Sequence, residues 1–155
     1  MMDLEFRKKI KTVIYGCDIC QICCPYNKGF DNPLASEIDP ELAHPELIPF
    51  LELSNGQFKE KFGSVAGSWR GKNILQRNAI IALANAHDRS AIPKLLSIIE
   101  TSQNQIHIAT AIWSLGQLVR EATPELVQLL LDIKNPSQDI IHERTAFFER
   151  FGISD

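Results

Sequence analysis

The sequence repeats itself: residues 79–85 read AIIALAN, and residues 111–117, 32 positions later, read AIWSLGQ. Residues 92–99 (IPKLLSII) recur in the same way 31 positions later as residues 123–130 (TPELVQLL). Each unit therefore pairs an Ala-rich helix with a second helix that opens on a proline. A period near 31 residues built this way is typical of HEAT-like repeats, in which each unit buries its apolar face against its neighbours.

Helix signals continue on both sides of these repeats. Ser54 and Gln57 have the spacing of a capping box, ahead of a helix that should end at Gly63. Further helices are expected over residues 73–87, 91–101 with Ser90 as cap, 103–121, 124–133 after the Thr123-Pro124 cap, and 138–151 after Ser137. No convincing strand pattern appears. Near the N-terminus, the cysteines at positions 17, 20 and 24 have the Cys-x2-Cys-x3-Cys-Pro spacing of bacterial ferredoxins. The predicted fold class is therefore all-α: a short ferredoxin-type cysteine loop segment followed by a HEAT-like α-solenoid of about two to three helical-hairpin repeats. The first and last of these helices, over residues 55–62 and 138–151, should cap its two ends.

The N-terminal third has a different character. Residues 4–14 form a short amphipathic segment that we expect to be helical, although β-branched residues at 12–14 equally suit an extended chain. Prolines 33, 40, 45 and 49 predict an irregular connector with at most short helical turns near residues 40–48. We therefore divide the chain into a partial 4Fe–4S ferredoxin-type segment, a Pro-rich acidic connector and a HEAT-like domain, over residues 1–30, 31–53 and 54–155.

Composition and length limit the class of protein. With 155 residues, 45% of them apolar and 23% charged, the chain can bury a real core and is not a disordered segment. It has no apolar run of the ~18 residues that a membrane span needs, and its first residues lack the pattern of a secretory signal. We expect a cytoplasmic protein without a membrane partner.

All four cysteines fall within eight residues, at Cys17, Cys20, Cys23 and Cys24. Such crowding suits a soft metal better than disulfides, which stabilise most when they close long loops. The spacing Cys-x2-Cys-x3-Cys-Pro, ending at Pro25, is typical of the bacterial ferredoxin run, in which the last cysteine ligates the other cluster of a pair. The pattern therefore favours [4Fe–4S] clusters.

Two alternatives to iron and sulfur stay open. Zinc could use the cysteines, but the adjacent pair Cys23 and Cys24 can hardly place both sulfurs on one ion together with Cys17 and Cys20 without strain. The thiols could also be redox-active or vestigial. Two [4Fe–4S] clusters need more thiolates than these four, so by the ferredoxin pattern neither cluster can be completed from this chain.

A basic zone lies in this otherwise acidic chain of net charge −3. Residues 56–94 carry seven Lys or Arg against two acidic residues, and Arg70, Lys72 and Arg77 lie close to Trp69 in the sequence. An aromatic ring with cations around it suits phosphate and base contacts in RNA. The alternative is that Trp69 plugs the core and the charges are simply solvated.

Other prominent side chains have structural explanations. Catalytic triads, phosphate-binding loops and dinucleotide glycine patterns do not occur. We expect core packing for the aromatic residues of the repeats and a structural role for two helical histidines: Trp113, Phe147, Phe148, Phe151, His107 and His142.

The motifs and their order resemble a known family. IYGCDICQ at residues 14–21, CPYN at 24–27, FKEKF at 58–62 and RNAIIALAN at 77–85 look like the C-terminal part of epoxyqueuosine reductases. This resemblance implies a cobalamin-dependent enzyme with two [4Fe–4S] clusters that reduces epoxyqueuosine to queuosine in tRNA, the last step of queuosine biosynthesis. It also implies that the HEAT-like domain helps to hold the tRNA.

Carried over by motif, Cys17 and Cys20 would ligate one cluster and Cys24 the other, while Cys23 would be an extra thiol. Tyr26 replaces the more usual Trp. The family's cobalamin-binding region, upstream cysteine run and acidic proton donor are absent from this sequence. We therefore expect a fragment that is inactive alone and binds tRNA through Arg70, Lys72 and Arg77. Either it works with a separate chain that carries the cobalamin domain and the remaining ligands, or it is a remnant that has lost activity. The alternative is a non-catalytic HEAT-like adaptor with a zinc-binding or vestigial cysteine element.

Overall fold

The computed structural model describes residues 2–29 and 39–153, so residues 30–38 of the expected connector lie outside it. The described residues are helical and contain no strand, as expected for the all-α class. In chain order, with η for a 3-10 turn, the elements are α1 (Leu4–Lys9), α2 (Ile19–Cys23), η1 (Pro25–Asn27), α3 (Pro40–Ala43), α4 (Leu47–Glu52), α5 (Asn55–Phe62), η3 (Ala66–Arg70), α6 (Lys72–Asn85), η4 (Arg89–Ala91), α7 (Ile92–Thr101), α8 (Gln105–Leu118), α9 (Pro124–Leu131) and α10 (Gln138–Phe151).

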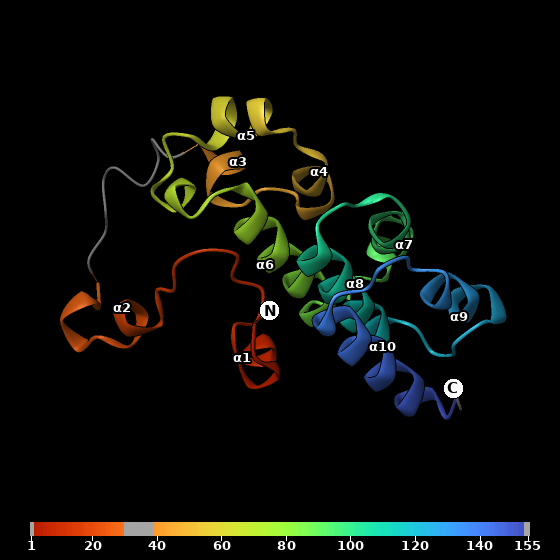
Figure 1. The fold of residues 1–155 in the computed structure, drawn as a ribbon. Helices are drawn as coiled ribbons and strands as arrows, with labels where there is room; N and C mark the ends of the chain where they lie inside the picture. Colours follow the sequence, from red (N-terminus) through yellow and green to blue (C-terminus); the bar gives the residue numbers. More distant parts are fainter. Residues whose placement is uncertain (1, 30–38, 154–155) are drawn as a thin grey trace.

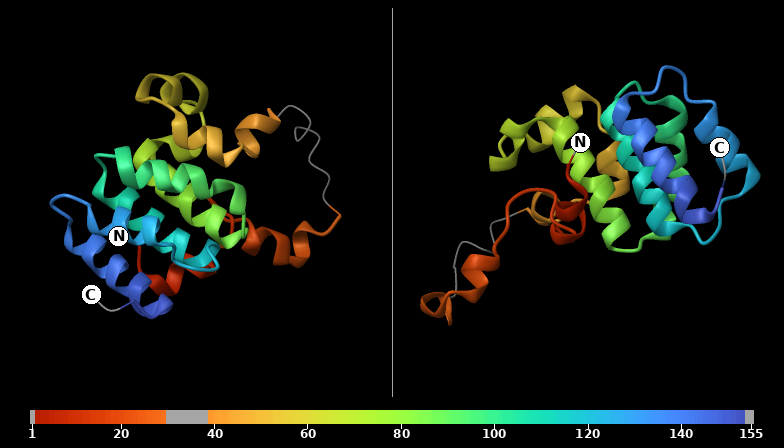
Figure 2. Two further views of the ribbon diagram at one scale, coloured as in Figure 1. Left: turned by 90° about the vertical axis from the view of Figure 1, so that its right-hand side faces the viewer. Right: turned by 60° about the horizontal axis from the view of Figure 1, so that its bottom comes forward.

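The repeats predicted from the sequence form two layers of helices. Figure 1 shows α6, α8 and α10 side by side in one layer, with α7 and α9 packed on one face of it. The first helix of each sequence repeat is α6 or α8, and the second is α7 or α9. The opposite face of the layer receives the N-terminal segment, which Figure 2 shows in red beneath α10 and α8.

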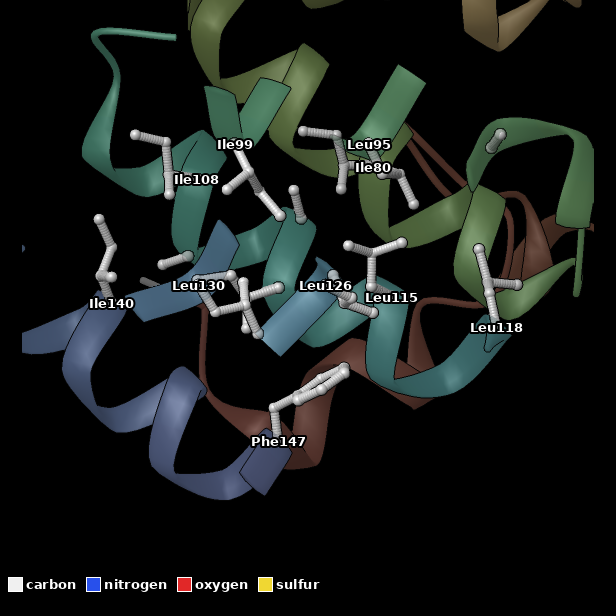
Figure 3. Close-up of a cluster of buried hydrophobic side chains, with 14 of the residues drawn as sticks. Ile80, Leu95, Ile99, Ile108, Leu115, Leu118, Leu126, Leu130, Ile140 and Phe147 are labelled. Atoms are coloured by element: carbon white, nitrogen blue, oxygen red, sulfur yellow. The ribbon is translucent and has the colours of Figure 1, made fainter. Parts of the chain in front are cut away.

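Helix α8 is the centre of the stack because it contacts α6, α7 and α10. Its small residues allow close approach: Ser114 Oγ donates to the Ile80 carbonyl of α6 at 3.2 Å. A Cβ added at Gly116 would meet the Phe147 ring of α10 at 3.4 Å. The largest core cluster gathers around this helix, and Figure 3 shows Leu95 of α7 and Leu130 of α9 in the same cluster as Leu115 of α8. Burial of this apolar surface is the main stabilising term of the stack.

Most predicted helix caps are present. The Ser54–Gln57 capping box is closed in both directions, with Gln57 N on Ser54 Oγ at 3.2 Å and Ser54 N on Gln57 Oε1 at 2.9 Å. Thr123 and Ser137 cap α9 and α10, and Gly152 ends α10 in the left-handed conformation. These local signals work because a side-chain oxygen replaces the missing intrahelical acceptor.

Two predicted boundaries were wrong. Ser90 does not cap the helix that follows it: Asp88 accepts from Ser90 N at 3.0 Å, and η4 precedes the start of α7. The helix expected over residues 103–121 is shorter, because Asn104 caps α8 through its side chain and the chain is extended at Val119. For residues 4–14, where two conformations were open, helix α1 ends at Lys9 and the β-branched residues at 12–14 lie outside it.

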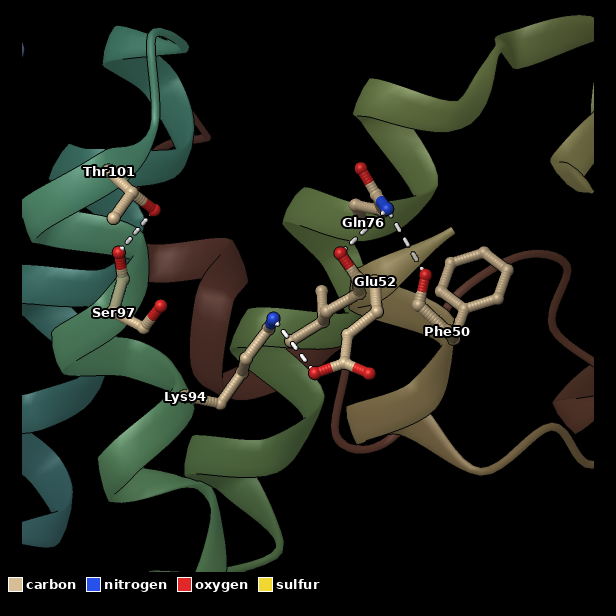
Figure 4. Close-up of polar contacts among 7 residues, drawn as sticks. Phe50, Glu52, Gln76, Lys94, Ser97 and Thr101 are labelled. Atoms are coloured by element: carbon tan, nitrogen blue, oxygen red, sulfur yellow. Dashed lines mark hydrogen bonds and ion pairs between the residues drawn. The ribbon is translucent and has the colours of Figure 1, made fainter. Parts of the chain in front are cut away.

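The start of the stack is closed by a cluster of phenylalanines. Phe50 of α4 packs against Phe58 and Phe62 of α5 with edge-on rings at 6.1 and 5.2 Å, and Leu75 of α6 completes the cluster. Gln76 Nε2 donates to the carbonyls of Phe50 and Leu51, both at 3.1 Å, as Figure 4 shows for Phe50. The end of the acidic connector is therefore packed onto the repeat domain.

The aromatic residues expected in the core are Trp113, Phe147, Phe148 and Phe151. The first three are buried, and Phe151 is half-buried against the same cluster. Trp69 is different: it is 69% exposed, which excludes the core-plug alternative for it.

Candidate functional site

The four cysteines lie on a segment that projects from the helical body (Figure 1). Cys17 precedes α2, Cys20 and Cys23 lie on it, and Cys24 follows it. All four are free thiols; the first three are exposed and Cys24 is half-buried. The turn after α2 is held by Asn27, whose Nδ2 donates to the Gln21 carbonyl at 3.1 Å.

Within residues 2–29 and 39–153, no three Cys, His, Asp or Glu side chains converge on one point. The donor set is nevertheless of the right kind for an iron–sulfur cluster, because exposed thiols on a short turn can approach an inorganic core from one side. The surface around them is apolar and uncovered: Ile19, Ile22 and Tyr26 are 55%, 76% and 93% exposed. The segment fits one part of a cluster site and lacks the rest.

Helix α6 fixes the chain that leads into the cysteines. Asn78 Nδ2 donates to the Ile14 carbonyl at 2.7 Å. About two helical turns further along the same face of α6, Asn85 Nδ2 donates to the carbonyls of Arg7 and Lys11, both at 2.7 Å. Lys11 has a φ of 51°, a left-handed conformation that costs energy for a non-glycine residue and is held by such contacts. The two amides therefore determine the path of the backbone before Cys17.

Arg7 anchors α1 to the far end of the repeat domain. Its Nη2 lies 2.8 Å from Oε1 of Glu143 on α10, and both side chains are almost completely buried. Its guanidinium lies 5.3 Å from the centroid of the Trp113 ring, and its Nε donates to the Met2 carbonyl at 2.8 Å. A buried charge needs a partner of this kind, so the contact also specifies where α1 can dock.

A groove of about 620 Å³ runs between this N-terminal segment and the start of α6. Among the described residues, no carboxylate lines this groove. Its lining includes Cys17 and four cationic side chains: Lys9, Lys11, Arg70 and Arg77. We call this the basic groove. Burial and the nearby positive charge of Arg7 lower the pKa of Arg77, although a guanidinium remains protonated. Partly desolvated like charges of this kind are stabilised when an anion binds between them.

The three predicted RNA-binding residues are divided between two grooves. Arg70 and Arg77 line the basic groove, whereas Lys72 lines a separate polar groove of about 790 Å³. Lys72 Nζ donates to the Leu53 carbonyl at 3.0 Å. In the same polar groove Lys94 pairs with Glu52 at 3.0 Å, a contact shown in Figure 4. Helix periodicity explains the separation, because residues 72 and 77 lie on different faces of α6.

Trp69 and Arg70 stand at the mouth of the basic groove. Trp69 Nε1 donates to Tyr15 Oη at 3.2 Å, and the Arg70 guanidinium lies 4.2 Å from the centroid of the Trp69 ring. Both residues are exposed, and Tyr15 and Arg70 also line the groove. The aromatic residue and the cation that the sequence places next to each other are thus paired in space.

His107 has the structural role expected for it. It lies at the start of α8, and its Nε2 is 2.8 Å from the Asn73 carbonyl of α6. A carbonyl oxygen can only accept, so Nε2 carries the proton. Burial lowers the pKa of His107, and the positive charges of Lys72 and Arg77 add to this effect against the opposing hydrogen bond to Asn73. His142 lies exposed on α10.

Comparison with known proteins agrees with this architecture. Residues 71–146 match the family model for HEAT repeats. The chain is 54% identical over 120 residues to an epoxyqueuosine reductase of Lactococcus garvieae and 44% identical over 147 residues to one of Bacillus cereus. It also superimposes on a solved epoxyqueuosine reductase of Streptococcus thermophilus with a TM-score of 0.91 and 59% identity over 99% of this chain. Over nearly its whole length, the chain is similar to part of an epoxyqueuosine reductase.

Its similarity to the family's proteins extends over only part of them. The matches cover 34% and 38% of the two curated epoxyqueuosine reductases and 41% of the solved one, so the chain spans about two fifths of their length. Another solved epoxyqueuosine reductase, 41% identical with a TM-score of 0.87, contains an epoxyqueuosine-modified tRNA-Tyr stem loop; 98% of this chain matches 41% of that protein.

The sequence analysis missed several candidate functional residues. Lys9 and Lys11 reach the basic groove only because the N-terminal segment folds back onto α6. The same fold gives Asn78 and Asn85 their partners. The only signal that could have found the two amides is their spacing of seven residues, which places them on one face of a helix.

In the described parts of the chain, no helix has the length and apolar character to span a membrane.

Proposed function

We propose that this chain is the cluster-binding and tRNA-binding portion of an epoxyqueuosine reductase and works with a separate polypeptide that carries the cobalamin region. Cys17 and Cys20 would ligate one [4Fe–4S] cluster and Cys24 the other, with the remaining ligands supplied by that polypeptide. Cys23 would not ligate. When bound, the clusters and cobalamin would carry electrons from an external reductant to the epoxide, for reduction of epoxyqueuosine to queuosine in tRNA.

The observation that supports this proposal most is the exposure of the cysteine segment. Three thiols and three large apolar side chains, Ile19, Ile22 and Tyr26, are in solvent on a segment whose approach is firmly held by Asn78 and Asn85. Large apolar side chains grouped on an exposed surface mark an interaction site. A second polypeptide that covers this surface and adds thiolates would explain both features.

The chain's own residues would have two tasks in that assembly. The hydrogen bonds of α6 hold the backbone before Cys17, which would keep this residue in place to ligate a cluster. Arg70 and Arg77 in the basic groove would bind phosphates of the tRNA beside the cysteine segment. Phosphate contacts by Arg and Lys supply most of the salt-dependent affinity of proteins for nucleic acids.

Iron and acid-labile sulfide analysis under anaerobic conditions tests the proposal. We expect little cluster in the chain purified alone, and brown protein with iron and sulfide in equal amounts when the polypeptide with the cobalamin region is coexpressed. One equivalent of zinc, with no sulfide under either condition, would support the other candidate function: a HEAT-like adaptor whose cysteines bind zinc.

The tRNA role has its own test. Charge removal in Arg70→Gln with Arg77→Gln should weaken tRNA binding and reduce its salt dependence by about two phosphate contacts. Lys72→Gln with Lys94→Gln is the matched control, because it also removes two positive charges, both from the polar groove. Equal losses in both variants would assign the effect to net charge and contradict the groove as the tRNA site.

A further inference from the structure

The exposed Trp69 ring is held in one place by its neighbours. Tyr15 Oη accepts its Nε1–H at 3.2 Å, and Arg70 covers one face of the ring with its guanidinium 4.2 Å from the centroid. The ring is still 69% exposed, so a large area of it faces solvent. An ordered aromatic surface backed by a cation is the arrangement on which proteins stack nucleobases.

The backbone around the ring is built to keep it there. Tyr15 packs so closely on Gly67 that an added Cβ would lie 2.6 Å from its ring. Ser68 Oγ donates to the Gly63 carbonyl at 2.9 Å, and Gly71, with a φ of 82°, turns the chain from η3 into α6. Only glycine adopts that conformation without strain. The position of Trp69 is therefore fixed before any ligand arrives, which reduces the entropic cost of binding.

Cations lie next to this ring, in the basic groove. Arg70 belongs to both, since it stacks on Trp69 and lines the groove, and Tyr15 also contributes to both. Arg77 and Lys11 line the groove further along. The exposed ring and the row of cations are therefore adjacent. Together they suit the two parts of a single nucleotide: the ring can stack on its base, and the cations can bind its phosphate.

We propose that Trp69 stacks an unpaired nucleobase of the bound RNA, while Arg77 and Lys11 hold the adjoining phosphate. This inference rests on the proposed function in one respect, that the ligand is RNA. It adds the residue that would contact the base. That base has to lie in a loop or a single strand, because a base inside a duplex is already stacked on its neighbours. Trp69 is thereby a specificity residue that selects loops over duplexes, next to the segment that carries Cys17.

The two tryptophans of the chain make a direct test possible. Trp113 is 8% exposed beneath Arg7, so collisional quenching of emission reports mainly on Trp69, and a Trp113→Phe variant isolates it. The probes are a stem-loop RNA and a duplex of the same stem without the loop. We expect the stem-loop to shift the Trp69 emission and to protect it from acrylamide, and the duplex to leave both unchanged.

RNA-binding measurements on variants of Trp69 test the same proposal. Trp69→Leu should weaken stem-loop binding by about tenfold or more with an unchanged salt slope, since base stacking is sequence-tolerant and uncharged. Trp69→Tyr should retain most of the affinity, and duplex binding should be the same in all three proteins. Stem-loop binding by the Leu variant as tight as by the wild type would overturn the stacking role alone. A wild-type chain that binds neither RNA would contradict both this inference and the RNA part of the proposed function.

Discussion

Arg7 and Glu143, near opposite ends of the sequence, form an ion pair of 2.8 Å with side chains only 4% and 2% exposed. This contact joins the segment that leads to the cysteines with the last helix of the repeats. Arg7 Nη1 has no hydrogen-bond partner among the described residues, so the pair is incompletely satisfied. The ion pair therefore does more to specify where α1 docks than to stabilise the fold, because each charge can be buried only next to the other.

Removal of one partner should be costly. Arg7→Met leaves the Glu143 carboxylate buried without a counter-charge, and we expect a loss of about 3–5 kcal/mol in the free energy of unfolding. The exposed pair of Lys9 and Glu5 is the matched control, and Lys9→Met should cost less than about 1 kcal/mol. Urea unfolding followed by circular dichroism measures both. The double variant Arg7→Met with Glu143→Leu should recover most of the loss, and a double variant as unstable as the single one would refute the account of this pair.

The side-chain amides of Asn78 and Asn85 on α6 should keep the backbone that leads to Cys17 well ordered. In Asn78→Ala and Asn85→Ala, carbonyls before Cys17 lose their donors, and we expect each substitution to cost about 1–2 kcal/mol. Hydrogen exchange of residues 8–17 should become faster in both. Asn73→Ala, an exposed position on the same helix, serves as the control and should leave exchange in that segment unchanged. Unaltered exchange in the two variants would mean that other contacts hold the segment.

Gly67 should tolerate no side chain. In Gly67→Ala the added methyl group would lie 2.6 Å from the Tyr15 ring, so the ring has to move, at a cost of about 1–3 kcal/mol. The hydrogen bond from Trp69 would be lost with it, which should shift the Trp69 emission. Gly56→Ala is the comparison, because the nearest atom to its Cβ is Ser54 Oγ at 3.9 Å and alanine favours a helix. A stable Gly67→Ala protein with wild-type emission would show that Tyr15 does not pack there.

Acid should destabilise the fold through His107. Its pKa is lowered by burial, so the unfolded chain binds a proton more readily than the native one. Stability should therefore fall as the pH drops below about 6.5, the ordinary histidine value, and level off below the lowered pKa of the native state. His107→Gln keeps a donor for the Asn73 carbonyl and should remove this part of the pH dependence. The melting temperature of both proteins between pH 5 and 8 measures it; parallel profiles would contradict the assignment.

The sequence predicted what depends on local pattern and missed what depends on distant contacts. The repeats at 79–85 and 111–117 were found because they carry the small and apolar residues that bury α6 and α8, and Ser54 and Thr123 because a cap is a local hydrogen bond. The pairing of Arg7 with Glu143 follows from no local rule. Nor does the folding of Lys11 toward Arg77, so the sequence could not show that Arg70 and Arg77 line one groove while Lys72 lines another.

The most direct measurement of the central claim compares cysteine variants in the complex with the polypeptide that carries the cobalamin region. Iron content and Mössbauer spectra of the anaerobic complex should show that Cys23→Ser keeps the full complement of iron. Cys17→Ser and Cys20→Ser should damage one cluster, and Cys24→Ser should damage the other. If all four variants retain wild-type iron, or if the wild-type complex contains none, this chain does not ligate the clusters and the account is wrong.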